Sequence, residues 1–398
     1  MDRETNRPKK LGFRPSKAPN PSPSSSSPVR LRPREETKRD STSSIHERRN
    51  PVLDEDEETG SPIFSYLVGT CPDMCPAKER QQRERLRDLS VFERLHGDPS
   101  RTSSKLAVKK FCRTMSNAEL QEVEIRPLPV LRSTLKYLMN LVDTSDQPFE
   151  VVHDFVFDRT RSIRQDLTRQ NILDDEAICM YEEMVKFHIE SHKKLAMCYT
   201  KTDLASLCYL NTEQLMKCLA TLFKLFDIHR RSSSLYKNEA EFYSFYVLLH
   251  LGGKIPQMQG SSLSLWYRKL TLSILQSNEM RFSMTLIRYS QLGNFKRFFT
   301  RLEAEASDLQ LCLVEPFLSE IRARAISYVN HSGYKLQPYP LKHLSDVLRI
   351  KESELEELCH VCGLETTMDE AGMKTLPVKQ TSFSLPKLGL PVHSLSTF

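Results

Sequence analysis

Residues 69–76 read Gly-Thr-Cys-Pro-Asp-Met-Cys-Pro, and a charged helical run opens directly behind them with Ala77-Lys78-Glu79-Arg80. This octapeptide separates a polar, proline-rich segment from roughly 300 residues of helical pattern. Pro76 suits a first helical position, because its missing N–H would have no partner there. The octapeptide therefore predicts a proline-stiffened start of a helical domain and, by itself, no chemistry.

Apolar residues recur at helical spacing from Pro76 to about residue 330. One such face consists of Leu131, Leu135, Leu138, Met139 and Val142, and similar faces lie within residues 178–188, 204–226 and 242–249. Pairs of these helices recur about every 35 to 45 residues without a repeat consensus, as in a diverged helical solenoid. We predict a mainly α fold: a right-handed helical-hairpin solenoid, TPR/PCI-like, over residues 61–330, with its opening motif at 69–80.

The C-terminal third has a different pattern. Residues 340–348 and 352–362 show two helix patterns joined by a turn, and Gly363 stops the second. Residues 364–378 read as a β-hairpin, and residues 333–336 predict a further short strand. Helix, turn, helix and hairpin predict a winged helix over residues 331–380. A helical solenoid that ends in a winged helix is the PCI-type architecture of proteasome-lid, signalosome and initiation-factor scaffolds. Residues 381–398 have weak periodicity and predict a flexible tail.

The positive charge of the chain is concentrated at its N-terminus. The net charge is +6 over 398 residues, but residues 1–50 hold 13 Lys and Arg against 6 Asp and Glu, whereas the remainder holds 44 against 45. Residues 1–60 are also rich in Ser and Pro, which predicts a disordered basic tail. Its basic clusters fit a nuclear localisation signal or a weak RNA-binding segment. They fit equally well a solvated tail that no partner binds.

Several function classes have no support in the sequence. No run approaches the roughly 18 apolar residues of a membrane span, and the N-terminus has no apolar signal region. The sequence contains no Gly-rich phosphate loop, no His-Glu-x-x-His and no Gly-x-Ser-x-Gly. We therefore expect no enzyme, no cofactor, no small-molecule substrate and no membrane partner. Ten cysteines in a chain of this length suit a reducing compartment.

Two cysteine pairs allow a metal-binding alternative. Cys71 and Cys75, with Cys359 and Cys362, would supply four zinc ligands, and a zinc hydrolase built on them is the enzyme alternative. Prolines interrupt the first pair, and the second lies within a helix pattern whose neighbours point inward. We favour buried thiols over metal ligands.

A second informative string is residues 153–167, His-Asp-Phe-Val-Phe-Asp-Arg-Thr-Arg-Ser-Ile-Arg-Gln-Asp-Leu. Its Arg159, Arg161 and Arg164 alternate with aromatic and aliphatic residues, as on an RNA-phosphate or partner-contact surface. The alternative is an internal ion-pair lattice, in which the interleaved aspartates neutralise these arginines. The even spacing of acids and bases favours the structural alternative.

Together, the two strings resemble the SAC/GANP family, the scaffold subunits of the second transcription–export complex (TREX-two), which helps messenger RNA leave the nucleus. The resemblance covers about residues 60–380, and its opening motif is Cys71, Pro72, Asp73, Met74, Cys75 and Pro76. It implies a non-enzymatic nuclear scaffold, in the nucleoplasm or at the nuclear rim. It also implies pairing with a second PCI-type subunit and, through that subunit, with a small acidic peptide subunit.

The resemblance implies RNA contact as well. Paired winged helices in the family present a joint basic surface, and the matching candidates here are Lys342, Arg349, Lys351 and Lys374. The second helix of the predicted module, however, carries four glutamates between residues 352 and 357, whose charge repels phosphates. We therefore expect chiefly protein docking, with RNA binding that is weak alone or shared with the partner.

One departure from the family pattern leaves an alternative function open. Long members carry nucleoporin-like repeats before the shared region and a centrin-recruiting helix behind it, and this sequence shows neither. Short members are associated with the centrosome and spindle, or with transcription and splicing, so an interaction protein of that kind is the alternative. The cytoplasm and the centrosome are accordingly further expected locations. A proteasome or initiation-factor PCI subunit would share the fold but would lack the octapeptide.

Overall fold

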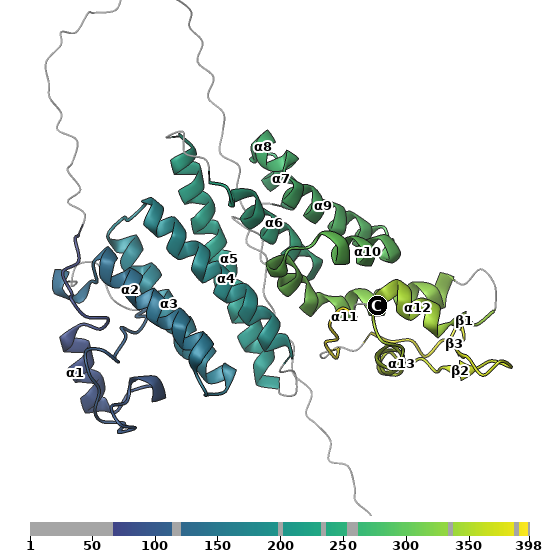
Figure 1. Ribbon diagram of the computed structural model, residues 1–398, viewed down its shortest axis with the longest axis horizontal. Helices are drawn as coiled ribbons and strands as arrows, with labels where there is room; N and C mark the ends of the chain where they lie inside the picture. Colours follow the sequence, from purple (N-terminus) through teal and green to yellow (C-terminus); the bar gives the residue numbers. More distant parts are fainter. Residues whose placement is uncertain are drawn as a thin grey trace, which may run out of the picture. The chain divides into compact units, whose positions relative to one another are not determined.

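The computed structural model describes residues 67–113, 121–197, 202–231, 236–252, 262–332, 337–385 and 390–396. Residues 64–398 form one unit by their contacts, whereas the predicted tail at 1–60 lies outside the described residues, as does the strand predicted at 333–336. Helices dominate the described chain, which confirms the mainly α prediction (Figure 1). In the described chain, no helix is long and apolar enough to cross a bilayer.

The described helical elements follow one another along the sequence, with the widest separation between η1 and η3. In chain order they are α1 (Ala77–Leu86), the short 3-10 turns η1 (Val91–Glu93) and η3 (Glu122–Glu124), α2 (Leu128–Thr144), α3 (Phe149–Arg169), α4 (Asp175–Met197), α5 (Thr202–Arg231), α6 (Glu239–Leu249), η4 (His250–Gly252), α7 (Leu263–Tyr267), α8 (Leu272–Gln276), α9 (Asn278–Gln291), α10 (Phe295–Glu305), α11 (Asp308–Ser332), α12 (Leu341–Leu348) and α13 (Glu352–Val361).

The apolar periodicity predicted these helices well. In α2, Leu131, Leu135 and Leu138 are all buried, because residues three and four apart share one face of a helix. The helix α1 begins at Ala77, and Pro76 is its N-cap rather than its first helical residue. The ψ of Pro76, 140°, is not helical, so the proline ring lies just before the first turn and not within it.

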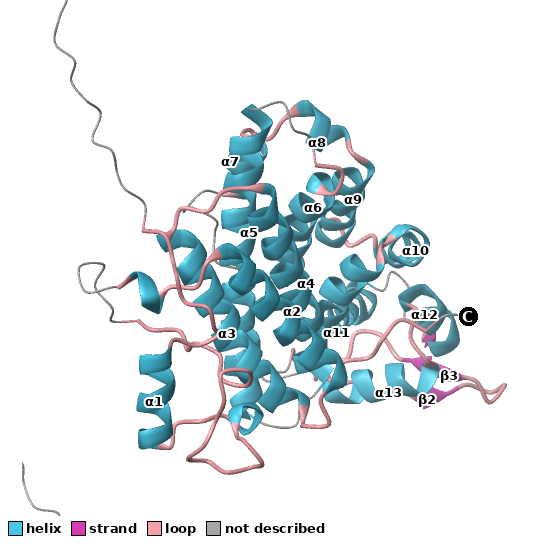
Figure 2. Ribbon diagram, turned by 60° about the vertical axis from the view of Figure 1, so that its left-hand side comes forward, coloured by secondary structure: helices cyan, strands magenta, loops and turns pink. Residues whose placement is uncertain are grey.

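Most of the long helices pack side by side, some with the next helix in the chain and α6 with the more distant α9. The helix α2 lies against α3, α4 against α5, and α9 against both α6 and α10, as the ribbon in Figure 1 shows. The long helix α11 packs against α4 and α6 at one end and against α10 and α13 further along, so it joins the helical body to the C-terminal elements (Figure 2).

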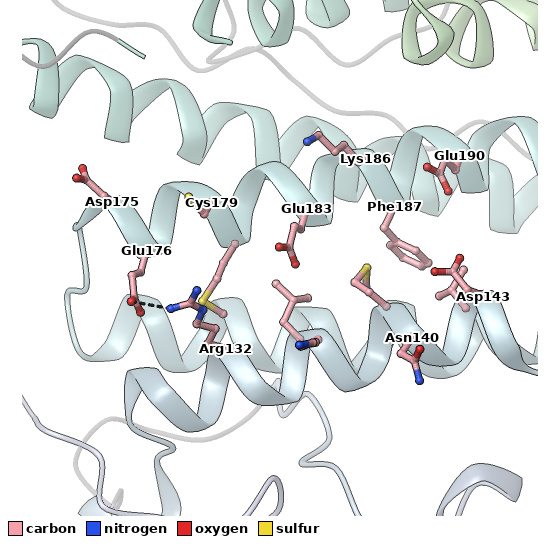
Figure 3. Close-up of a pocket in the computed structure, with 15 residues that line it drawn as sticks. Arg132, Asn140, Asp143, Asp175, Glu176, Cys179, Glu183, Lys186, Phe187 and Glu190 are labelled. Atoms are coloured by element: carbon pink, nitrogen blue, oxygen red, sulfur yellow. Dashed lines mark hydrogen bonds and ion pairs between the residues drawn. The ribbon is translucent and has the colours of Figure 1, made fainter. Parts of the chain in front are cut away.

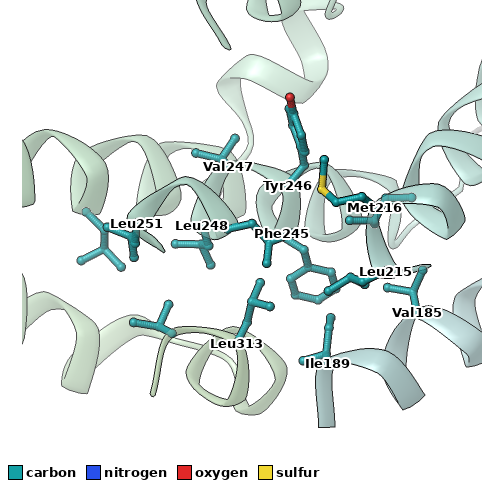
Figure 4. Close-up of a cluster of buried hydrophobic side chains, with 14 of the residues drawn as sticks. Val185, Ile189, Leu215, Met216, Phe245, Tyr246, Val247, Leu248, Leu251 and Leu313 are labelled. Carbon is teal, nitrogen blue, oxygen red and sulfur yellow. The ribbon is translucent and has the colours of Figure 1, made fainter. Parts of the chain in front are cut away.

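The core lies where α4, α5, α6 and α11 converge. Figure 4 shows Ile189 from α4, Leu215 from α5, Phe245 from α6 and Leu313 from α11 pointing into one cluster. All four side chains are fully buried. Burial of an apolar side chain of this size stabilises the fold by about 1.5 to 3 kcal/mol, so four helices from distant parts of the sequence are held together by dry contact.

The C-terminal elements form a small module, which we define as residues 337–380. It contains α12, α13 and a three-stranded antiparallel sheet in the order β1-β3-β2. The strands β2 (Thr367–Met368) and β3 (Lys374–Leu376) are the predicted hairpin, and β1 (Tyr339–Pro340) pairs with β3 in addition. The sequence did not predict β1, because a two-residue strand ending in proline has no alternation to detect.

The chain after the hairpin returns along α11. Asn330, fully buried, accepts from the backbone N–H of Gln380 and donates to its carbonyl, both at 2.9 Å. Further on, Arg322 of α11 donates to the carbonyl oxygens of His393 at 2.6 Å and Ser394 at 3.3 Å. For residues 381–398 the sequence predicts a flexible tail; in the structure, residues 390–396 have hydrogen-bond partners on α11 and at the end of α12.

Arg322 is the centre of this arrangement. Its guanidinium is fully buried and also donates to the carbonyls of Leu348 at 3.2 Å and Arg349 at 2.7 Å. Burial lowers its pKa to about 10, although Glu354 and Glu315 oppose that shift. The residue therefore stays charged at neutral pH and joins α11, the end of α12 and residues 393–394 through carbonyl oxygens.

We expect Arg322→Met to reduce the free energy of unfolding by about 2 to 4 kcal/mol, because buried carbonyls lose a charged donor. Urea unfolding followed by circular dichroism measures this loss. The matched control is Arg324→Met, two residues along the same helix, where only one 3.3 Å bond to Ser290 is lost. Equal losses in the two variants would show that the carbonyl contacts of Arg322 add nothing.

Candidate partner and nucleic-acid interface

The opening motif is held to the helical body by its backbone. The N–H of Cys71 donates to the carbonyl of Ile125 at 2.9 Å, and the carbonyl of Met74 accepts from the N–H of Lys109 at 3.0 Å. A side chain at Gly69 would meet the Ile125 carbonyl oxygen at 2.5 Å, so only glycine allows this approach. Asp73 pairs with Arg80 at 2.9 Å. The motif is thus an attachment segment in the structure.

The two thiols of the motif are buried. Burial raises the pKa of Cys71, and raises that of Cys75 to about 12, so both are protonated and poor nucleophiles at neutral pH. Cys359 and Cys362 are also buried, in the C-terminal module, with pKa values raised to about 12 and about 11 by the same cause. No group of three or more His, Cys, Asp or Glu that could hold a metal ion occurs among the described residues.

Beneath the motif, Glu93 forms the first of two buried charge nodes. Its carboxylate, fully buried, contacts Arg83 and lies 3.0 Å from Arg159. Burial raises the pKa of Glu93, but Arg159 and Arg83 outweigh it and hold the pKa below its ordinary value. Arg159 is only 3% exposed and also pairs with Asp158 at 2.5 Å. The sequence predicts that Arg159 contacts RNA or a partner. The structure contradicts this prediction, because the Arg159 guanidinium is buried and pairs with Glu93 and Asp158 inside the fold.

Asp166 forms the second node. Its carboxylate accepts from Lys109 at 2.7 Å and from Arg126 at 2.8 Å, and all three side chains are buried. Arg126 also donates to Ser162 at 2.7 Å and to the carbonyl of Met74 at 3.3 Å. The string at 153–167 thus supplies Asp158, Arg159 and Asp166 to the ion pairs that attach the opening motif to α3. Of its three arginines, only Arg159 is neutralised by an aspartate of the string within the described chain, as the structural alternative expected for all three.

Two arginines of the same string lie outside this lattice. Arg161 stacks on Phe111 with its guanidinium carbon 3.9 Å from the ring centroid, and Arg164 donates to Gln214 at 2.6 Å. Both are half-buried, and within the described ranges neither has a carboxylate at ion-pair distance. Burial lowers the pKa of Arg161, and repulsion from Arg164 and Arg113 lowers it further. We call Arg113, Arg161 and Arg164 the α3 arginine patch.

The basic residues predicted in the C-terminal module are mostly paired. Arg349 lies 2.7 Å from Glu303, Lys374 lies 2.6 Å from Glu356, and Lys351 lies 3.8 Å from Glu354. Lys342 is exposed on α12 and has no ion pair within the described part of the chain. Acids of α13 and α10 therefore neutralise three of the four predicted RNA contacts, and only Lys342 presents an uncompensated charge.

Three histidines between α3, α4 and α5 are buried without charge. The Asn211 side-chain oxygen lies 2.8 Å from His188 and 3.2 Å from His153, and the ring of His192 packs against Phe317. Burial lowers the pKa of His188 to about 3 and that of His192 to about 4. Neutral imidazoles in a closed interior have a structural role at neutral pH.

A groove of about 680 Å³ lies between α2 and α4. Because α2 packs mainly on α3 and α4 mainly on α5, the facing rows of α2 and α4 leave this space between them. Figure 3 shows Arg132, Asn140 and Asp143 on one wall and Cys179, Glu183 and Glu190 on the other. The sequence gives no local signal for this groove, because its two walls come from helices that are separate in the sequence.

Comparisons with known proteins place the chain in one family. The model of the SAC3/GANP family matches residues 74–368. The SAC3 family protein B of Arabidopsis thaliana is 38% identical over 313 residues, which are 77% of this chain and 18% of that protein. The SAC3 family protein 1 of Schizosaccharomyces pombe is 32% identical over 332 residues, 80% of this chain and 32% of that protein. The protein xmas of Drosophila melanogaster is 27% identical over 337 residues, 80% of this chain and 16% of that protein. The chain therefore spans a third or less of each relative.

Proposed function

Because the chain belongs to the SAC3/GANP family, we propose that it is a non-enzymatic scaffold subunit in nuclear messenger-RNA export. The family match over residues 74–368 carries this proposal, since it runs from Met74 of the opening motif through the arginine string to the strand β2 of the C-terminal module. The buried thiols of the opening motif are protonated, and the carboxylates of Glu93 and Asp166 are paired with bases inside the fold, so these groups hold the fold together.

We further propose the finer architecture that the sequence predicts. The helix pairs α2–α3 and α4–α5 are the first hairpins of a right-handed, PCI-like solenoid. The module with α12, α13 and the sheet β1-β3-β2 is its terminal winged helix. The domain boundaries at residues 60, 330 and 380 belong to the same proposal. The order helix, helix, hairpin supports this interpretation.

For the partner, we propose a second PCI-type subunit that docks on the C-terminal module and brings a small acidic peptide subunit with it. The exposed side of α13 is acidic, and Met368 and Met373 of the hairpin are 67% and 55% exposed. Methionine side chains adapt to a partner surface, and an acidic helix is poorly suited to a nucleic-acid groove. These features support protein docking as the main role of the module.

For RNA, we propose that the α3 arginine patch contacts phosphates, together with Lys342 and a surface that the partner supplies. Guanidinium groups without acidic partners are free to neutralise phosphate, and Phe111 next to Arg161 adds an aromatic face. Arg159 is excluded from this surface by its burial. Arg349, Lys351 and Lys374 contribute only if the partner or RNA displaces their glutamates.

The double variant Arg161→Glu/Arg164→Glu should weaken binding of a 20-nucleotide single-stranded RNA by about tenfold or more at about 50 mM salt. The slope of log affinity against log salt should also fall by about 1.4, because two phosphate contacts on a single strand are lost and fewer counterions are released. Fluorescence anisotropy titrations between about 50 and 200 mM salt measure both quantities.

The matched control is Arg281→Glu/Arg288→Glu, the same charge change at two exposed positions of α9. The variant Arg161→Gln/Arg164→Gln removes the two charges without adding acids. If its unfolding curve matches that of the unmodified chain, any loss of RNA affinity comes from the lost contacts and not from lost stability. Equal weakening in the α3 and α9 variants would reject the patch as the contact. Equal RNA affinity with and without the PCI-type partner would reject the shared surface.

A further inference from the structure

The groove between α2 and α4 has an apolar floor along its whole length. Leu135, Met139 and Val142 of α2 face Met180 and Phe187 of α4, and Leu135, Met180 and Phe187 are almost fully buried. Two of these five residues are methionines, whose flexible side chains adjust to an incoming surface. Met139 and Val142 are partly exposed and are the part of the floor that an incoming side chain reaches first. We call these five residues the apolar strip.

The length of the groove matches a helix of three to four turns. Its residues on α4 run from Asp175 to Glu190, which corresponds to about 22 Å at 1.5 Å per residue. On α2 they run from Arg132 to Asp143, about 16 Å by the same rise. Two helices that stand apart with facing rows accept a third helix of three to four turns by packing ridges into the groove.

The rim of the groove is acidic. Within the described residues, Asp143, Glu183 and Glu190 form no ion pair, whereas Arg132 is paired with Glu176 at 2.9 Å. Of the lining bases, only Lys136 and Lys186 remain to oppose those three carboxylates. Figure 3 shows Asp143 and Glu190 at the same end of the groove, beside Phe187. Carboxylates on both walls of the groove repel an acidic peptide or a nucleic acid, so these two kinds of ligand are disfavoured.

We propose that this groove is a docking site for a basic amphipathic helix of a partner protein. The apolar face of that helix lies on the strip, and its Lys or Arg side chains meet Glu183 and Glu190. These two glutamates are seven residues apart, so they lie two turns apart on one side of α4. The partner helix therefore carries bases about seven residues apart along one edge, and a further base near Asp143.

The groove and the RNA contact proposed above use different residues. The groove lies on α2 and α4, whereas Arg161 and Arg164 lie on α3, Arg113 precedes η3, and Lys342 lies on α12. Anionic RNA has no affinity for an acidic groove. A groove variant should therefore lose peptide binding but keep its RNA affinity. An RNA titration of that variant distinguishes failure of this proposal from failure of the RNA contact.

Cys179 makes the groove observable without an introduced label. Its side chain lines the groove and is exposed. Burial of part of the thiol raises its pKa, as do Glu182 and Glu183 nearby, so the reaction with maleimide is slow enough to time. Peptide mass spectrometry after trypsin identifies the modified cysteine, which separates Cys179 from the other thiols.

The experiment uses two synthetic 18-residue helical peptides with the same leucine face, one with a lysine polar face and one with a glutamate polar face. We expect the cationic peptide to bind the full chain, measured by anisotropy, and to slow maleimide modification of Cys179 at least fivefold. The anionic peptide should do neither. Equal binding of both peptides, or binding without protection of Cys179, would overturn the proposal.

The groove variant is Glu183→Lys/Glu190→Lys, and its matched control is Glu320→Lys/Glu370→Lys, the same charge change at exposed positions of α11 and the hairpin turn. The affinity for the cationic peptide should fall at least tenfold in the groove variant and change less than twofold in the control. Equal losses would show attraction to overall charge and refute the site. Sedimentation must also show a monomer, because a dimer that the groove variant dissociates would make a second copy the occupant.

Discussion

Replacing Asp166 with asparagine is expected to lower the free energy of unfolding by about 3 to 5 kcal/mol. Its carboxylate is the acid partner of both Arg126 and Lys109, and all three side chains are buried. An amide leaves two buried cations without a counter-charge, and removal of one partner from a buried pair costs more than the pair contributes. Urea unfolding at pH 7 measures the change.

The matched control is Asp88→Asn, which breaks the exposed pair of Asp88 with Lys110 at 2.9 Å. Exposed pairs contribute at most about 1 kcal/mol, so this variant should unfold almost as the unmodified chain does. Limited proteolysis adds a structural check, because the Asp166 variant should release the opening motif first. A loss below 1 kcal/mol for Asp166→Asn would mean that water or rearrangement neutralises Arg126 and Lys109.

The second large effect is a loss of stability in mild acid. The pKa of His188 is lowered to about 3 and that of His192 to about 4, from 6.5 in the unfolded chain, chiefly by burial. Between those values the unfolded chain binds more protons, so the free energy of unfolding falls as the pH drops below 6.5. Each histidine lowers the free energy of unfolding by about 1.4 kcal/mol per pH unit. Between pH 6.5 and pH 4.5 the loss is therefore about 2 to 3 kcal/mol for each of the two histidines.

His192→Leu isolates one of these two contributions. Leucine has a similar volume and no titrating group, so the fall in stability between pH 6.5 and 4.5 should shrink by about 2 kcal/mol. His343→Leu, at an exposed position of α12, is the control and should keep the full fall. Urea unfolding at a series of pH values gives the comparison. Identical pH profiles for all three chains would show that His192 becomes protonated inside the fold.

The helices were predictable because their signals are local. Leu131, Leu135 and Leu138 needed only the 3.6-residue period to be assigned to one buried face of α2. The hairpin at β2 and β3 was predictable from its turn residues, since Gly372 takes a positive φ of 74°. The strand β1 was not, because Tyr339 and Pro340 are strand residues only through their pairing with β3.

The candidate surfaces were less predictable than the helices. Arg159, Arg161 and Arg164 have the same residue type within six positions, yet the first is buried against Glu93 and the others are half-exposed. What separates them is Glu93, a residue 66 positions away in the sequence. The acidic row of α4 likewise becomes a groove wall only because α2 stands opposite to it.

The sequence by itself determined the helical character of the chain, the place where the helical domain begins, and the family, because periodicity and contiguous motifs are carried by neighbouring residues. Only the tertiary structure decided which charges are internal and which face outward. A charged side chain is neutralised by whichever opposite charge the fold brings within about 4 Å, and that distance is set by packing between helices that are remote in sequence.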